Sequence, residues 1–148
     1  RLKMPTYAEK RNLPHSPQHM FDLVSDVEKY PEFLPWCVGV RLKQRTSANI
    51  SADMVIGYKM FREKFSCRVE LDSPKRINVV YENGPFKYLN NHWIFIEEAD
   101  GSCTIDFFID FEFNSTLLQK VIEVVFNEAV KIMVHAFEKR ANIIYNKN

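Results

Sequence analysis

Glycine is scarce in this chain, with four residues among 148. The four lie apart from one another, at Gly39, Gly57, Gly84 and Gly101, and the sequence contains no GxGxxG, no P-loop and no GxSxG. Such motifs cradle phosphates on backbone N–H groups or present a nucleophilic serine on a tight turn. Their absence argues against the common nucleotide-binding sites and against a serine hydrolase.

Cysteine is also rare. Cys37, Cys67 and Cys103 are odd in number and widely spaced, without a CxxC. We therefore expect neither a disulfide framework nor a zinc site, and a reducing compartment fits best. The sequence has no stretch of about 18 apolar residues, so we expect no transmembrane helix. The N-terminal residues have no long apolar run, so we see no signal peptide in them.

An excess of charge of one sign is missing too. The chain has 20 lysine and arginine residues against 19 aspartate and glutamate residues, a formal charge of +1. Nucleic-acid-binding domains usually carry a basic excess, so DNA is not an expected partner. The short basic clusters, Lys43 with Arg45 and Lys59 with Arg62 and Lys64, are typical of solvated strand ends.

Side chains with catalytic or metal-binding chemistry are scattered. His15 and His19 have the i, i+4 spacing of a helical metal pair, but no third ligand is evident. Asp106, Asp110 and Glu112 share one strand face, which fits a solvent-facing polar stripe better than a paired-carboxylate site. We therefore predict no metal, no cofactor and no catalytic residue.

Aromatic residues are abundant. They make up 14% of the chain and include 12 phenylalanines. Either the core is unusually large, or part of this aromatic surface lines something that is not protein.

The order of the patterns predicts an α+β fold in one domain, residues 1–148. Residues 6–13 form a strand, Ser16 caps a first short helix, and residues 32–34 form a second short turn. Period-two alternation then runs through about six antiparallel strands to Phe113. Asn114–Ser115 starts a long helix that reaches about Tyr145. The sheet curves around this helix, and the space between them is either filled or hollow.

The apolar stripe of the long helix is expected to face the sheet. Its predicted members are Leu118, Val121, Ile122, Val125, Ala129, Ile132, Met133, Ala136, Phe137 and Ile144.

Two predicted hairpins carry apolar residues where turns are usually polar. Met60 and Phe61 occupy the first, and Phe86 and Leu89 flank Lys87 in the second. Apolar tips beside basic residues suit contact with lipid head groups and tails. The alternative is that the tips fold back onto the helix, and the sequence leaves both open.

Four segments together resemble the coenzyme Q-binding protein (COQ10-like) family of the START-like, or Bet v 1-like, superfamily. They are FDLVSDVEKYPEFLPWC (21–37), GPFKYLNNHW (84–93), FEF with Ser115 (111–115) and AFEKRA (136–141). The likeness covers nearly the whole chain. It implies a helix-grip fold with a tunnel between sheet and long helix. The two prolines in the first segment suggest a rigid corner in which Phe33, Leu34 and Trp36 wall one end of the tunnel.

The resemblance also implies a function. This is non-catalytic binding and transport or chaperoning of ubiquinone, or a similar polyisoprenoid lipid, in support of respiratory electron transport. It implies a location in bacterial cytoplasm, peripheral to the inner membrane, or on the mitochondrial matrix side. The family also includes ribosome-association toxins that block subunit joining, and its domain label mentions polyketide cyclases. A ribosome-binding protein and a cyclase-like enzyme therefore stand as alternatives.

On this interpretation we predict two sets of site residues. The tunnel is lined by Trp36, Met54, Phe65, Trp93, Phe95, Phe107, Ile109, Phe111, Val121, Val125, Ala129, Met133 and Phe137. The tunnel mouth, which touches a membrane, is formed by Met60, Phe61, Phe86, Lys87 and Leu89.

Overall fold

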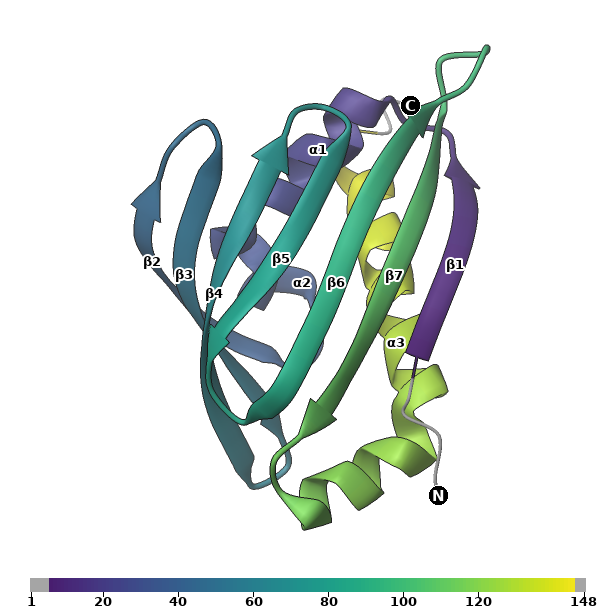
Figure 1. Ribbon diagram of the computed structural model, residues 1–148. Helices are drawn as coiled ribbons and strands as arrows, with labels where there is room; N and C mark the ends of the chain where they lie inside the picture. The colour runs from purple at the N-terminus through teal and green to yellow at the C-terminus, as the bar shows by residue number, and fades with distance from the viewer. Residues whose placement is uncertain (1–5, 146–148) are drawn as a thin grey trace.

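A computed structural model describes residues 6–145 and has the predicted α+β arrangement (Figure 1). One antiparallel sheet of seven strands runs in the order β1-β7-β6-β5-β4-β3-β2. Its strands are β1 Thr6–Leu13, β2 Cys37–Arg45, β3 Asn49–Tyr58, β4 Phe61–Asp72, β5 Arg76–Asn83, β6 Phe86–Glu97 and β7 Cys103–Phe113.

The helices all lie on one face of this sheet (Figure 1). They are α1 Pro17–Ser25, the 3-10 turn η1 Val27–Lys29, α2 Tyr30–Phe33 and α3 Thr116–Tyr145. The Ser16 hydroxyl accepts a hydrogen bond from the His19 N–H at 3.1 Å, which caps α1 as the sequence predicts. The first turns of α3 run across the lower end of the sheet, and its later turns rise along the sheet face (Figure 1). Sheet and helix therefore enclose the interior between them.

Strand β2 departs from the predicted alternation at its start. The alternation of Val38, Val40 and Leu42 with Gly39, Arg41 and Lys43 predicts that the first three share a core face, but Val38 is 47% exposed. The cause is a break in the β2–β3 register between Cys37 and Gly39, which inserts a residue and turns Val38 outward.

The buried face of α3 also differs from the predicted stripe. Ile132 and Ile144 are 51% and 42% exposed, so these two were placed wrongly. The buried positions are Gln119, Phe126, Val130, Val134, Phe137 and Ala141. The i, i+4, i+8 spacing of 126, 130 and 134 was a readable signal. It was missed because α3 is apolar on more than one side, so periodicity alone does not choose between the stripes.

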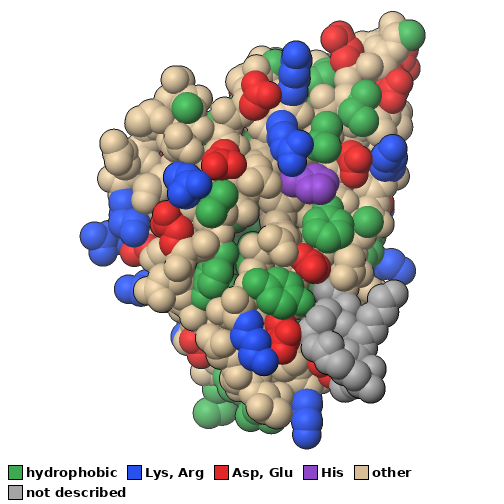
Figure 2. All heavy atoms as spheres, in the orientation of Figure 1, with side chains coloured by type: hydrophobic (Ala, Val, Ile, Leu, Met, Phe, Trp, Pro, Cys, Tyr) green, Lys and Arg blue, Asp and Glu red, His purple; other side chains and the backbone are tan. Residues whose placement is uncertain are grey.

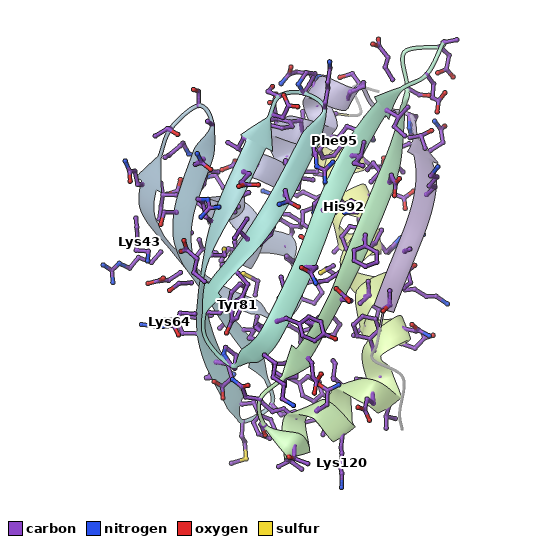
Figure 3. The ribbon with its side chains drawn as sticks, viewed as in Figure 1. Lys43, Lys64, Tyr81, His92, Phe95 and Lys120 are labelled. Atoms are coloured by element: carbon purple, nitrogen blue, oxygen red, sulfur yellow. The ribbon has the colours of Figure 1, made fainter. Side chains whose placement is uncertain are left out.

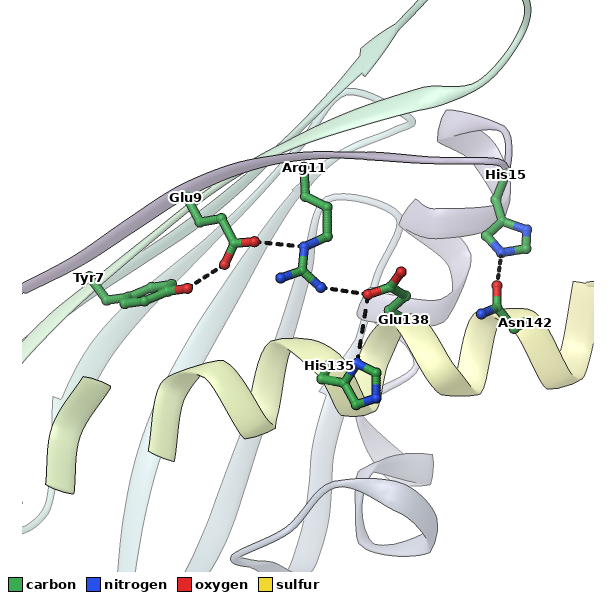
Figure 4. A network of polar contacts seen from close by, with 7 residues as sticks. All are labelled: Tyr7, Glu9, Arg11, His15, His135, Glu138 and Asn142. Atoms are coloured by element: carbon green, nitrogen blue, oxygen red, sulfur yellow. Dashed lines mark hydrogen bonds and ion pairs between the residues drawn. The ribbon is translucent and has the colours of Figure 1, made fainter. Parts of the chain in front are cut away.

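The later half of α3 is tied to β1 by a polar network (Figure 4). The Arg11 guanidinium donates to Glu138 Oε1 at 2.5 Å and to Glu9 Oε2 at 2.6 Å. The Tyr7 hydroxyl donates to the other Glu9 oxygen, and burial together with this carboxylate raises the pKa of Tyr7 to about 12. Glu138 also lies 3.8 Å from His135 on its own helix.

Contacts with the first helices hold the same half of α3. His15 Nε2 and Asn142 Oδ1 are 2.8 Å apart, and Arg140 donates to Glu32 of α2 at 2.8 Å. The Arg140 guanidinium also lies over the Phe33 ring. The first half of α3 is held differently: the buried Gln119 accepts the Phe113 N–H at 2.8 Å and so fixes the helix start to the end of β7. The end of α3 near its C-terminus is therefore the more firmly anchored one.

Candidate functional site: an apolar cavity

A cavity of about 330 Å³ lies between the concave sheet face and α3. Its walls come from η1, α2, strands β2 to β7 and the first three-quarters of α3. This volume falls in the range of pockets that hold drug-sized apolar ligands. The interior is therefore hollow rather than filled by side chains.

Twelve of the thirteen predicted tunnel residues line this cavity. They are Trp36, Met54, Phe65, Trp93, Phe107, Ile109, Phe111, Val121, Val125, Ala129, Met133 and Phe137. Phe95 (labelled in Figure 3) does not line it. Its ring packs against Phe21 of α1, with centroids 6.0 Å apart, and stacks behind Trp93. Phe95 is therefore core, because α1 covers the upper end of the sheet where β6 ends.

The second hairpin folds back into the wall. Phe86 is 6% exposed, its ring stacks on Phe113 at 4.8 Å, and both rings line the cavity. Leu89 lines the cavity as well. Lys87 points the other way and pairs with Glu112 at 2.9 Å. Phe86 and Leu89 thus fold back into the wall, the alternative that the sequence leaves open, while Lys87 stays exposed. Lys87 and Leu89 lie on opposite sides because a register shift between Phe86 and Tyr88 interrupts the alternation along β6.

The β3–β4 hairpin remains exposed. Met60 is 94% exposed and Phe61 39%, and Phe61 also lines the cavity. Across from them on α3, Val121 and Val125 line the cavity while each is 38% exposed. These residues belong to the cavity and to the surface at once, so the cavity opens between this hairpin and the first half of α3. We call this opening the mouth.

More exposed apolar side chains surround the mouth. Leu117 and Val124 of α3 are 61% and 84% exposed. Lys120 lies on the same part of α3 (Figure 3), and the Lys59 ammonium lies over the Tyr58 ring in the β3–β4 hairpin. Figure 2 shows hydrophobic side chains at the lower tip of the molecule, next to basic ones.

Trp36 and Cys37 form the wall where α2 turns into β2. Trp36 has a φ of 67°, a left-handed conformation that is uncommon for a bulky residue. Its carbonyl accepts the Gly57 N–H at 2.9 Å, which ties the corner to β3. Burial raises the pKa of the Cys37 thiol to about 11, so this thiol stays protonated at neutral pH. Leu34 also lines this corner, while Phe33 packs on Phe137 beside it.

Polar groups in the wall are few. Of the lining residues in the described part of the chain, only Glu63 and Asn91 carry a carboxylate or an amide. The Tyr30 hydroxyl is already engaged, because it donates to the Val24 carbonyl at 2.5 Å. The sequence reasoning missed Asn91, although its place in the alternation Leu89-Asn91-Trp93 indicates an inward side chain.

Among residues 6–145, no group of three metal-ligating side chains comes together. Asp106 and Asp110, for which the sequence favours a solvent-facing polar stripe, lie on the outer sheet face. There Asp110 accepts a hydrogen bond from the Asn90 amide at 3.0 Å. None of the helices in the described range has the length and hydropathy of a membrane-spanning segment.

Comparison with known proteins identifies the family. The family described as polyketide cyclase / dehydrase and lipid transport matches residues 13–138. The chain belongs to this polyketide cyclase and lipid transport family. The predicted START-like resemblance is thereby confirmed.

Two of the similar proteins carry different kinds of name. A protein of Rickettsia prowazekii named ribosome association toxin RatA is 36% identical, over 93% of this chain and 97% of its own. A Xenopus laevis protein named coenzyme Q-binding protein COQ10 homolog B, mitochondrial, is 32% identical, over 95% of this chain and 59% of its own. The similar proteins thus include names from two of the three branches that the sequence motifs leave open, ribosome association and coenzyme Q binding.

A solved structure supports the fold. The START superfamily protein from Mycobacterium smegmatis superposes with a TM-score of 0.79 at 15% identity, covering 94% of this chain and 98% of that one. The helix-grip prediction is therefore confirmed for this polyketide cyclase and lipid transport family member.

Proposed function

We propose that this protein binds ubiquinone, or a similar polyisoprenoid lipid, in the cavity and carries or chaperones it without catalysing a reaction. The observation that carries the proposal is the hollow of about 330 Å³ whose walls are almost wholly apolar. The similarity to a protein named as coenzyme Q-binding supports a quinone as the ligand.

The binding energy on this proposal comes from burial. Removing apolar surface from water stabilises a complex by roughly 25 cal/mol per Å², or about 0.8 kcal/mol per CH₂ group. Apolar cavities tend to stay dry, so a lipid tail replaces empty space rather than ordered water.

The mouth gives the proposed route for the lipid. Exposed Met60 of the β3–β4 hairpin and Val124 of α3 would enter the lipid interface, while Lys59 and Lys120 of the same two elements would meet the head groups. We therefore propose a peripheral contact with a respiratory membrane, on its cytoplasmic or matrix face.

The test is mass spectrometry of an organic extract of the purified protein. We expect an isoprenoid quinone or a similar lipid in near-stoichiometric amount, and rebinding of a short-chain ubiquinone after the protein is stripped of lipid. The proposal fails if the folded, stripped protein neither releases such a lipid nor rebinds a quinone.

A second candidate is association with the ribosome. The similarity to proteins named ribosome association toxin RatA covers nearly the full length of both chains. The exposed edge strand β2 carries Arg41 and Lys43, and Lys64 lies on the same flank of the sheet (Figure 3). Lys43, however, is neutralised by Asp53 at 3.1 Å, which weakens this surface as a phosphate contact. Sucrose-gradient profiles of ribosomes, with and without the protein, test this candidate. A lower fraction of joined ribosomes when the protein is added favours it.

The cyclase-like enzyme is the weakest of the three. It needs an acid/base pair inside the cavity, and the described walls contain one carboxylate, Glu63, and no histidine.

A further inference from the structure

Asn91 is a polar exception in the apolar wall. It lies on β6 between two other lining residues, Leu89 and Trp93, and faces Ile109 of β7, which also lines the cavity. Asn91 is half-buried, and an amide that loses water without gaining a partner is costly, so its hydrogen bonds determine what it is able to bind.

The orientation of the Asn91 amide is fixed by one hydrogen bond. Its Nδ2 donates to the backbone carbonyl of Phe108 at 2.9 Å. A carbonyl only accepts, so the nitrogen must point toward β7 and Oδ1 must point away from that carbonyl. Within residues 6–145 this is the one hydrogen bond that the Asn91 side chain makes, so Oδ1 keeps its lone pairs available.

The sheet is locally open beside this amide. The β5–β6 ladder ends at the pair Val80↔Asn90, although β5 continues to Asn83 and β6 begins at Phe86. As a result, Val79, Leu89 and Asn91 line both the inner cavity and a groove on the outer sheet face. Tyr81 and His92, labelled in Figure 3, line the same outer groove. A polar group at Asn91 therefore lies near water even while a tail fills the cavity.

We propose that Asn91 binds the polar head of the cavity's lipid and that it selects a head with a hydroxyl donor, so that the reduced quinol binds more tightly than the quinone. This rests on the proposed function. A quinone oxygen only accepts hydrogen bonds, so it pairs with the second Nδ2–H of Asn91 and leaves Oδ1 to water from the outer groove. A quinol hydroxyl is able to donate to Oδ1 as well, so the quinol gains one more direct hydrogen bond than the quinone.

The test compares the affinities of a quinone and of its quinol for the same protein. Lipid-stripped protein is loaded with 1-anilinonaphthalene-8-sulfonate, and the dye is displaced under argon by a short-chain ubiquinone or by the quinol made from it. One net hydrogen bond corresponds to a preference for the quinol of roughly fivefold. In Asn91→Leu we expect both heads to displace the dye with equal affinity.

Asn90→Leu is the matched control. Asn90 precedes Asn91 but is exposed and donates to Asp110 on the outer face, so this variant should keep the fivefold ratio. Equal affinities in the wild type, or a preference that persists in Asn91→Leu, would overturn the inference while leaving the proposed function intact. Failure of both heads to displace the dye contradicts the proposed function instead. If Asn91→Leu does not fold, the ratio of quinol affinity to quinone affinity in the wild type decides whether the inference holds.

Discussion

Ala129 provides the sharpest test of the cavity as a ligand site. This small residue lines the cavity in the middle of α3, so Ala129→Phe places a phenyl ring in the space of about one isoprene unit. At about 0.8 kcal/mol per buried CH₂, losing a five-carbon unit costs up to about 4 kcal/mol. A tail that shifts toward the mouth recovers part of this. We therefore expect a loss of about 2 kcal/mol, or roughly thirtyfold weaker binding.

The fold should tolerate this change. The ring enters empty volume rather than displacing neighbours, so we expect the free energy of unfolding to change by less than about 1 kcal/mol. Dye displacement and the amount of copurified quinone measure binding, and urea unfolding measures stability. Ile132→Phe is the control, because Ile132 is 51% exposed on the same helix and does not line the cavity. Unchanged affinity in folded Ala129→Phe, or an equal loss in the control, would refute the reasoning.

Three further predictions concern the mouth, the helix start and pH. Met60→Ser should slow quinone delivery to anionic vesicles several-fold in a fluorescence-quenching assay, whereas Ile143→Ser, at the far end of α3, should not. Gln119→Leu leaves a backbone N–H at the end of β7 without its acceptor and should lower the free energy of unfolding by about 1–3 kcal/mol in urea titrations; no change would contradict the assigned role. A hydrogen bond from Ser66, with help from a nearby lysine, lowers the pKa of Asp53. Stability from this carboxylate is thus complete above its unfolded pKa of about 3.9 and is lost as pH falls through the lower folded value, so wild type and Asp53→Asn should converge in acid melts.

Strand positions could be predicted because period-two patterns report directly on a one-sided sheet. Phe107 and Phe111 share an alternating apolar face in β7, and both line the cavity as expected. The core position predicted for Val38 is wrong because a bulge shifts the strand register by one residue, and the sequence carries no obvious mark of that bulge. Alternation therefore gives the face of a residue only as far as the pairing continues unbroken.

Helix faces and ends were harder to predict. The buried Val130 was missed and the exposed Ile132 was included because both belong to apolar stripes of α3. The stripe that turns inward is the one that faces the sheet, and the sequence of the helix alone does not say where the sheet lies. Phe95 shows the same limit: its alternation is right, but α1 covers that end of the sheet and removes it from the cavity.

The raised pKa of Cys37 has a chemical consequence for the proposed ligand. Thiolates, not thiols, add to electrophilic rings, and a thiol with a pKa of about 11 has very little thiolate at neutral pH. A quinone head that passes this wall meets sulfur in its unreactive form. On the proposed function, Cys37 would thus face the carried quinone as a thiol and resist covalent modification by it.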